Sequence, residues 1–247
     1  MRRLILVLVL ALACSAAATA EEIRILTAGS LQRALAPIAE SYKAETGHDI
    51  TIEIGTTRVM RERLEAGESF DIIIGTIALL EEAAARGQVQ SDLSRVPEVG
   101  RVGIGIAVRR AADAGSVSTV DGLKELLLSA DSVVYNRGSS GVYSQSMIES
   151  LGITEQIASG TTQYANGGQV LSHVIEGEGT DLGLAPLTEI RANEVNGLVT
   201  IPLPDEVQNY TSYSAVVTTN AVEPAADLVR YLTTFTARDA FVATGVD

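Results

Sequence analysis

The sequence predicts an α/β protein built on an open, mostly parallel sheet. Short β-branched runs alternate with amphipathic helical runs along most of the chain. Turns rich in Gly, Ser and Thr join strand to helix at most of these junctions. The run Phe70–Ile74 is almost continuously apolar, as expected of a strand that is covered on both faces. Alternating β and α elements of this kind are typical of a parallel sheet with helices on its faces.

Composition excludes several classes of protein. The chain has 247 residues, of which 46% are hydrophobic and 20% charged, so neither a disordered chain nor a fibrous repeat fits. A chain of this length buries roughly three quarters of its extended surface and needs no metal or disulfide to fold. The net charge is -13 and the isoelectric point about 4.6, which makes nucleic acid and anionic membranes poor partners.

Residues 1–20 are predicted to be a secretory signal peptide. Two arginines precede an apolar run, and Ala18-Thr19-Ala20 forms a small-residue cleavage site. A lipid anchor at Cys14 is the less favoured alternative, because cleavage there would leave an unusually short leader. The mature chain is then exported and free of cysteine, which excludes thiol chemistry and disulfides. No later stretch reaches the roughly 18 apolar residues of a membrane span.

The first half of the mature chain predicts three strand–helix units. A strand at residues 23–26 precedes a helix ended by Gly47, which Pro37 is expected to break or kink. A strand at residues 49–54 precedes a helix stopped by Gly67, and a strand at residues 70–74 precedes a helix that runs to Gly87. The apolar face of the first helix carries Leu31, Leu35, Ile38 and Tyr42.

The second half repeats the pattern. A strand at residues 133–135 precedes a helix ended by Gly152, and two further helices are predicted at residues 169–175 and 187–192. The β-like runs at residues 102–108 and 213–218 lack such a helix and are interpreted as hinge strands. They would join one lobe, residues 21–102 plus 215–247, to a second lobe, residues 103–214.

The predicted chemistry lies where strands end and helices begin. In α/β sheets ligands bind at the carboxyl ends of strands, where helix N-termini present unpaired N–H groups. Hydroxyls and bare amides there form a neutral cage that can hold a small anion. Taken singly each residue is better explained as an ordinary cap or turn residue, but the repetition across both lobes favours binding. The candidate residues are Ser30, Thr56, Thr57, Thr76, Ser139, Ser140 and Gly168.

Several of these segments resemble the molybdate-binding proteins of ABC importers, which are type II periplasmic binding proteins. The likeness covers nearly the whole mature chain, and its motifs are Ala28-Gly29-Ser30-Leu31, Gly55-Thr56-Thr57, residues 64–67 before 70–74, Gly141-Val142-Tyr143 and residues 232–245. The resemblance implies a two-lobed Venus-flytrap fold with a mixed, mostly parallel sheet in each lobe. It also implies a periplasmic monomer that captures molybdate or tungstate, meets permease subunits, and carries no catalytic group, metal or cofactor.

Matching the family position by position assigns the binding hydroxyls to Ser30 and Thr57, and the backbone donors to Thr76, Ser140 and Gly168. Two positions depart from the family. Its usual cleft tyrosine falls on Pro186, which offers neither a hydroxyl nor an N–H, and its usual aspartate falls on Ile77. One oxyanion donor is therefore missing.

Two arginines suggest a different ligand. Arg58 follows Thr57 directly, and Arg137 lies in the loop at residues 136–141. Because a guanidinium is a planar fork suited to carboxylates, the alternative function is a receptor for a small organic carboxylate. Each arginine is equally well explained as a solvated surface residue.

An enzyme is not expected. Neither histidine, His48 or His173, lies near a serine in a G-x-S-x-G turn, and no H-E-x-x-H, P-loop or EF-hand spacing occurs. A periplasmic hydrolase on the same fold is the disfavoured alternative of another class. The effector domain of a transcription regulator would need a DNA-binding helix pair where the signal peptide lies.

Overall fold

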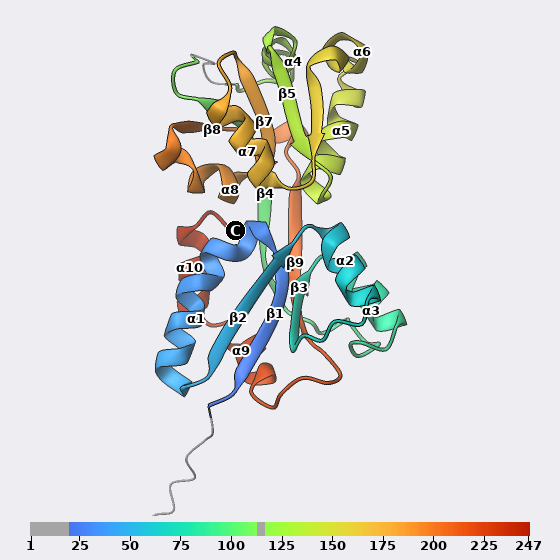
Figure 1. Ribbon diagram of the computed structural model, residues 1–247, viewed down its shortest axis with the longest axis vertical. Coiled ribbons are helices and arrows are strands. Elements are labelled where there is room, and N and C mark those ends of the chain that lie inside the picture. The colour runs from blue at the N-terminus through green and yellow to red at the C-terminus, as the bar shows by residue number, and fades with distance from the viewer. Residues whose placement is uncertain (1–19, 113–116) are drawn as a thin grey trace, which may run out of the picture.

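The computed structural model describes residues 20–112 and 117–247. Two lobes are stacked along the long axis of the molecule, and two long strands, β4 (Glu98–Arg109) and β9 (Tyr210–Val217), run between them (Figure 1). The expected two-lobed α/β fold with mixed sheets is confirmed. Most of the predicted signal peptide, with Cys14, lies outside the described residues.

The first lobe contains a sheet in which β1 (Glu22–Ala28) lies between β2 (Asp49–Gly55) and β3 (Ile72–Gly75), all three parallel. Strand β9 continues this sheet antiparallel to β3, and β4 pairs antiparallel with β9. One face is covered by α1 (Gln32–Thr46), α9 (Ala225–Tyr231) and α10 (Phe235–Ala243), and the other by α2 (Thr57–Glu65) and α3 (Ile77–Ala85).

The second lobe repeats this arrangement. Strand β5 (Ser132–Asn136) lies parallel between β6 (Thr161–Tyr164) and β7 (Asp181–Pro186), and β4 pairs antiparallel with both β7 and β8 (Leu198–Pro202). Helices α4 (Val120–Ser129), α5 (Ser139–Ser150) and α6 (Thr154–Ile157) cover one face. Helices α7 (Gly167–Glu176) and α8 (Leu187–Ala192) cover the other.

The two connecting strands belong to both lobes. Strand β4 pairs with β9 through Glu98–Gly103 and with β7 through Ile104–Ala107. The assignment of residues 21–102 plus 215–247 to one lobe and of residues 103–214 to the other stays a prediction.

Helix α1 differs from its sequence-based expectation. It runs unbroken for 15 residues with Pro37 inside it. Proline has no N–H to donate to the carbonyl of Arg33, but Arg33 and Pro37 both lie on the exposed face of the helix, so the lost hydrogen bond is not in the core. Gly47 ends the helix in the left-handed conformation as expected, and Leu31, Leu35, Ile38 and Tyr42 are buried.

Among the described residues, no helix combines the length and the apolar character that crossing a bilayer requires.

Candidate functional site

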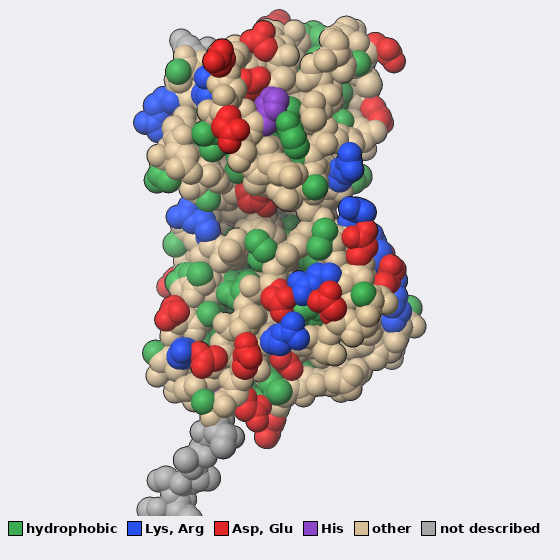
Figure 2. All heavy atoms as spheres, viewed as in Figure 1, with side chains coloured by type: hydrophobic (Ala, Val, Ile, Leu, Met, Phe, Trp, Pro, Cys, Tyr) green, Lys and Arg blue, Asp and Glu red, His purple; other side chains and the backbone are tan. Residues whose placement is uncertain are grey.

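A cavity of about 530 Å³ lies between the two lobes, at the waist of the molecule (Figure 2). Its walls come from the junctions where β1, β2, β5, β6 and β7 pass into the following helices. The N-termini of α2, α5 and α7 therefore open onto it, and their first N–H groups have no partner within the helix. These positive helix ends make the cavity attractive to an anion.

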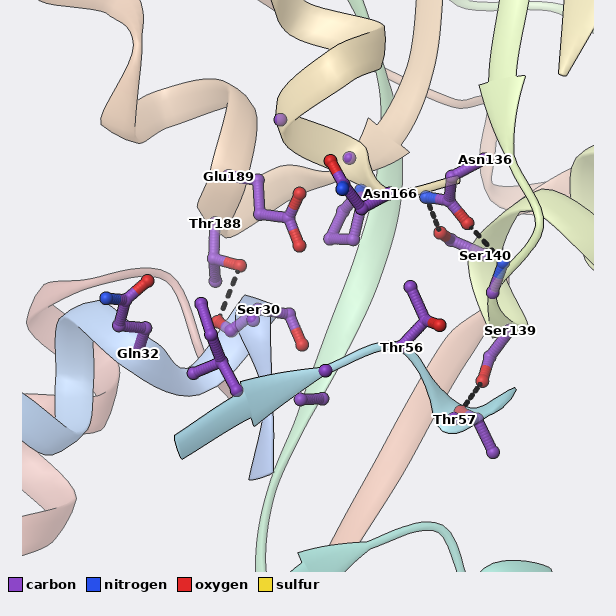
Figure 3. Close-up of a pocket in the computed structure, with 18 of the residues that line it drawn as sticks. Ser30, Gln32, Thr56, Thr57, Asn136, Ser139, Ser140, Asn166, Thr188 and Glu189 are labelled. Carbon is purple, nitrogen blue, oxygen red and sulfur yellow. Dashed lines mark hydrogen bonds between the residues drawn. The ribbon is translucent and has the colours of Figure 1, made fainter. Parts of the chain in front are cut away.

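One end of the cavity, here called the hydroxyl end, is formed by Thr56, Thr57, Asn136, Ser139 and Ser140 (Figure 3). The Oγ atoms of Thr57 and Ser139 lie 2.8 Å apart and form a hydrogen bond between the lobes. Asn136 holds the start of α5: its Nδ2 donates to Ser140 Oγ at 3.0 Å and its Oδ1 accepts from an N–H in the turn. All five side chains are neutral, so this end offers hydrogen bonds without a formal charge.

The opposite end, here called the carboxyl end, is formed by Ser30, Thr188, Glu189 and Tyr213. Thr188 Oγ1 donates to the backbone oxygen of Ser30 at 2.8 Å, which links the lobes a second time. Ser30 Oγ donates to the hydroxyl oxygen of Tyr213 at 3.0 Å. Hydrogen bonds therefore join the lobes at both ends of the cavity.

The Glu189 carboxyl group points into the cavity (Figure 3). In the described part of the chain, neither of its oxygens has a hydrogen-bond donor or a cation within reach. Burial raises the pKa of Glu189 to about 7. Burial likewise raises the pKa of Tyr213 to about 12, and the nearby Glu189 charge adds to that rise. At neutral pH the cavity therefore holds a carboxyl group that is partly protonated and able to donate a hydrogen bond.

The Glu189 carboxyl group packs directly against Gly167. A Cβ atom placed on Gly167, the first residue of α7, would overlap the Glu189 carboxyl group, so a larger residue there would displace that side chain from its position. Asn166, just before it, caps α7 by accepting a hydrogen bond from the Gln169 N–H at 3.0 Å.

Arg33 is the arginine that lines the cavity. It lies with Gln32 in the first turn of α1, and both side chains are exposed at the rim. In the described ranges no carboxylate lies within ion-pair distance of Arg33. Its charge is therefore available to a ligand that extends to the mouth of the cavity.

The structure brings four of the predicted site residues together at the cavity, namely Ser30, Thr57, Ser140 and Gly168, and it also places Thr56 and Ser139 there. Thr76, Arg58 and Arg137 do not line it. Thr76 directly precedes α3 in the first lobe. Their ligand-binding roles stay predictions, and the cavity geometry does not support them.

The two predicted arginines have other surroundings. Arg58 forms an exposed ion pair with Glu62 at 2.6 Å, one turn along α2. Successive helical residues point about 100° apart, so a side chain next to Thr57 leaves the cavity wall. Arg137 is exposed in the turn between β5 and α5, where its N–H donates to the backbone oxygen of Tyr164 at 3.0 Å.

Several lining residues carry no signal in the sequence analysis, among them the polar and titratable residues Arg33, Asn166, Thr188, Glu189 and Tyr213. Pro186 does line the cavity, as the resemblance placed it, and offers no donor there. The tyrosine of this cavity comes instead from strand β9.

Other reactive groups lie outside the cavity. Within residues 20–112 and 117–247, no three His, Cys, Asp or Glu side chains gather closely enough to hold a metal ion. His173 is in the second lobe, where its ring nitrogens contact Tyr164 Oη at 2.8 Å and Ser132 Oγ at 3.0 Å. The titratable side chains of the cavity are Arg33, Glu189 and Tyr213.

Residues 23–247 match the family model described as bacterial extracellular solute-binding protein, and the chain belongs to that family. A curated relative, an aconitate isomerase from a Pseudomonas species, is 28% identical over 239 residues. The match covers 94% of this chain and 89% of the relative.

Solved structures with low sequence identity share the fold. The periplasmic molybdate-binding protein of Azotobacter vinelandii has a TM-score of 0.75 at 15% identity, over 91% of this chain and 98% of that one. A sulfate-binding protein from Mycobacterium tuberculosis has a TM-score of 0.73 at 12% identity, over 92% and 86%. The L-phospholactate-bound protein PEB3 has a TM-score of 0.68 at 16% identity, over 91% and 98%. These neighbours are named for different anions, namely molybdate, sulfate and phospholactate, so the shared fold does not specify the ligand.

Proposed function

We propose that this solute-binding protein captures a small organic carboxylate between its lobes and delivers it to the permease subunits of an ABC importer. The observation that carries this proposal is the pairing of a neutral donor cage with a protonatable carboxyl group, Glu189, inside one cavity. The cage attracts anions in general. The carboxyl group disfavours small, fully ionised inorganic anions.

Cavity size supports an organic ligand. Four oxygen atoms of about a water's volume each, roughly 30 Å³, give a tetrahedral oxyanion a volume of about 120 Å³. The cavity measures about 530 Å³, which lies in the range of pockets that hold organic molecules. A compact ion would fill only part of this cavity, whereas a di- or tricarboxylate has separate carboxylate groups for its two ends.

Charge supports the same choice. Molybdate and sulfate are dianions at neutral pH, and an ionised Glu189 beside either would repel it. A carboxylate ligand can instead share a proton with Glu189 and place a second carboxylate among the neutral donors. The curated relative is named for aconitate, which is a tricarboxylate of suitable size.

A thermal-shift panel tests the ligand class. A ligand at 100 times its dissociation constant stabilises the folded state by about 2.7 kcal/mol, which for this chain length raises Tm by roughly 5 to 10 °C. We expect cis- or trans-aconitate or citrate to produce such a shift at pH 6.5, and molybdate, tungstate and sulfate to produce none. A shift by molybdate or tungstate alone would restore the oxyanion assignment.

The Glu189 side chain also favours a second function, which is isomerisation of a tricarboxylate. Moving a double bond within a tricarboxylate takes a proton from one carbon and returns a proton to another. A carboxyl group with its pKa raised to about 7 is suited to both steps. Proton NMR of aconitate incubated with the purified protein separates the two functions. Interconversion of the isomers that Glu189→Gln abolishes would indicate an enzyme, and binding without turnover would indicate a receptor.

A further inference from the structure

We propose that the cavity binds its ligand together with one proton, which Glu189 shares with a carboxylate oxygen of that ligand. This inference rests on the proposed function and adds the residue that decides which anions are accepted. The proton comes from solvent, the hydrogen bond forms between two carboxyl oxygens, and no covalent bond of the ligand changes.

In the described part of the chain, no cationic side chain pairs with Glu189 to balance an anion bound beside it. Tyr213 on β9 is neutral, and the cavity-lining residues of α7 and its cap, namely Asn166, Gly167, Gly168 and Leu171, carry no charge. Strand β8, which packs against α8, contains no charged residue. Strand β4 and the turn Glu194–Asn196 also pack against α8, and their charged residues do not line the cavity: Glu98, Arg101, Arg109 and Glu194. Arg191, on α8 itself, lies against Gly245 near the chain end. Arg33 supplies the only formal positive charge among the cavity-lining residues, and it lies at the exposed rim.

Two carboxylates held in one such site cannot both be ionised without strong repulsion, and one shared proton removes that repulsion. Neutral donors at the hydroxyl end can hold a second carboxylate of the ligand in its ionised form. The helix N-termini stabilise that negative charge. The cavity therefore accommodates an anion of two unlike ends, one ionised and one sharing a proton.

Proton uptake follows as a measurable consequence. Above pH 7 the free protein holds Glu189 mostly ionised, so each binding event must take up nearly one proton. Affinity is then expected to fall about tenfold for each pH unit above 7. A Glu189→Gln variant carries a permanent donor in the same place and should bind without uptake and without this pH dependence.

Calorimetric titration with trans-aconitate at pH 8 tests this directly. Titrations in Hepes and in Tris, whose ionisation enthalpies differ, give the number of protons exchanged without adding an inorganic oxyanion that could compete for the site. We expect nearly one proton taken up by the wild type, none by Glu189→Gln, and nearly one by the matched control Glu194→Gln. Glu194 accepts a hydrogen bond from Thr200 Oγ1 at 2.6 Å and does not line the cavity. Uptake near zero in the wild type, or unchanged uptake in Glu189→Gln, would overturn the proposal.

A measurement without ligand keeps the two proposals distinguishable. Infrared difference spectra between pH 6 and pH 9 should show a protonated-carboxyl band that disappears at high pH, and this band should be absent in Glu189→Gln. If aconitate fails to bind while the band is present, the ligand assignment is wrong and the proton-carrying role of Glu189 stands. If aconitate binds and the band is missing, the receptor stands and proton sharing is wrong.

Discussion

The hydroxyl end and the carboxyl end of the cavity are built from the same kind of junction, yet they differ in what they can recognise. At the hydroxyl end, neutral side chains such as Thr57 and Ser139 are hydrogen-bonded to one another across the lobes. At the carboxyl end, Glu189 and Tyr213 bring titratable groups to the wall. The first end suits anions in general because it combines hydroxyls with helix N-termini. The second end distinguishes between anions because its own charge depends on pH.

The largest effect is expected at the carboxyl end. The pKa of Glu189 is about 7 in the folded protein against 4.5 as the ordinary value, so the folded state binds this proton more tightly than the unfolded state. The stability contributed by the neutral form is complete below pH 4.5 and is lost as the pH rises through 7. Glu189→Gln should therefore be more stable than wild type at pH 8 by about 3 kcal/mol, and equally stable near pH 4.5.

Urea unfolding of both proteins at pH 4.5 and pH 8 measures this difference, with Glu194→Gln as the control that should follow wild type at both values. Identical pH dependence of wild type and Glu189→Gln would show that Glu189 is ionised normally. The carboxyl end would then carry a fixed negative charge at neutral pH and could not distinguish between anions by sharing a proton.

At the hydroxyl end the expected effect is on affinity. Thr57→Ala removes a donor and the interlobe bond to Ser139, and it should weaken binding of any anion by about 1.5 to 3 kcal/mol. Ser30→Ala should cause a similar loss at the carboxyl end, where it leaves Tyr213 without its partner. The control is Ser91→Ala, in an exposed bend outside the cavity. Calorimetric dissociation constants that agree for all three variants would mean that backbone N–H groups alone hold the ligand.

A smaller effect is expected at the rim. Arg33 is exposed, so its attraction for a ligand carboxylate is screened by water, and Arg33→Gln should weaken binding of aconitate by about 0.2 to 1 kcal/mol. Arg58→Gln is the matched control, because Arg58 pairs with Glu62 outside the cavity. A larger loss for Arg58→Gln than for Arg33→Gln would indicate that the ligand lies near Arg58, as the sequence-based alternative expects.

The smallest change is expected in overall shape. Ligand binding should favour the arrangement in which both interlobe hydrogen bonds are made, so the radius of gyration in X-ray scattering should decrease slightly on saturation with aconitate. An unchanged radius at saturation would mean that the two ends of the cavity already meet in the free protein.

Much of the fold could be predicted because its signals are local. The strand–helix alternation follows from hydrophobic periodicity, and Gly47 marks a helix end because only glycine readily adopts its positive φ of 81°. Strand β6 was not anticipated. Its residues 161–164 are polar and partly or fully exposed at the edge of the sheet, so they lack the apolar alternation of a buried strand.

The site was predictable only where the same local signals apply. Ser30, Thr57 and Ser140 stand at helix starts, and those positions converge by virtue of the topology. Glu189 could not be found in this way, because an acidic residue in the first turn of a helix is common and indicates nothing about a cavity. Its exposure to the cavity depends on how α8 packs against the other lobe, and that is a tertiary property.

The same limit explains why the sequence alone pointed to Arg58, whereas Arg33 is the arginine that lines the cavity. Arg33 and Arg58 each lie in the first turn of a helix that follows a cavity-facing turn. Helix phase and lobe packing decide which of them faces the ligand, and neither is set by the residue and its neighbours alone.

A crystal structure of the protein grown with trans-aconitate at pH 6 tests the central claim most directly, because it shows which end of the cavity holds which ligand atom. We predict one ligand carboxylate among Thr57, Ser140 and the N-terminus of α5. A second ligand carboxylate should have an oxygen within hydrogen-bond distance of the Glu189 carboxyl group. A cavity without aconitate, or one that takes up molybdate at the hydroxyl end while Glu189 turns away, would contradict the account.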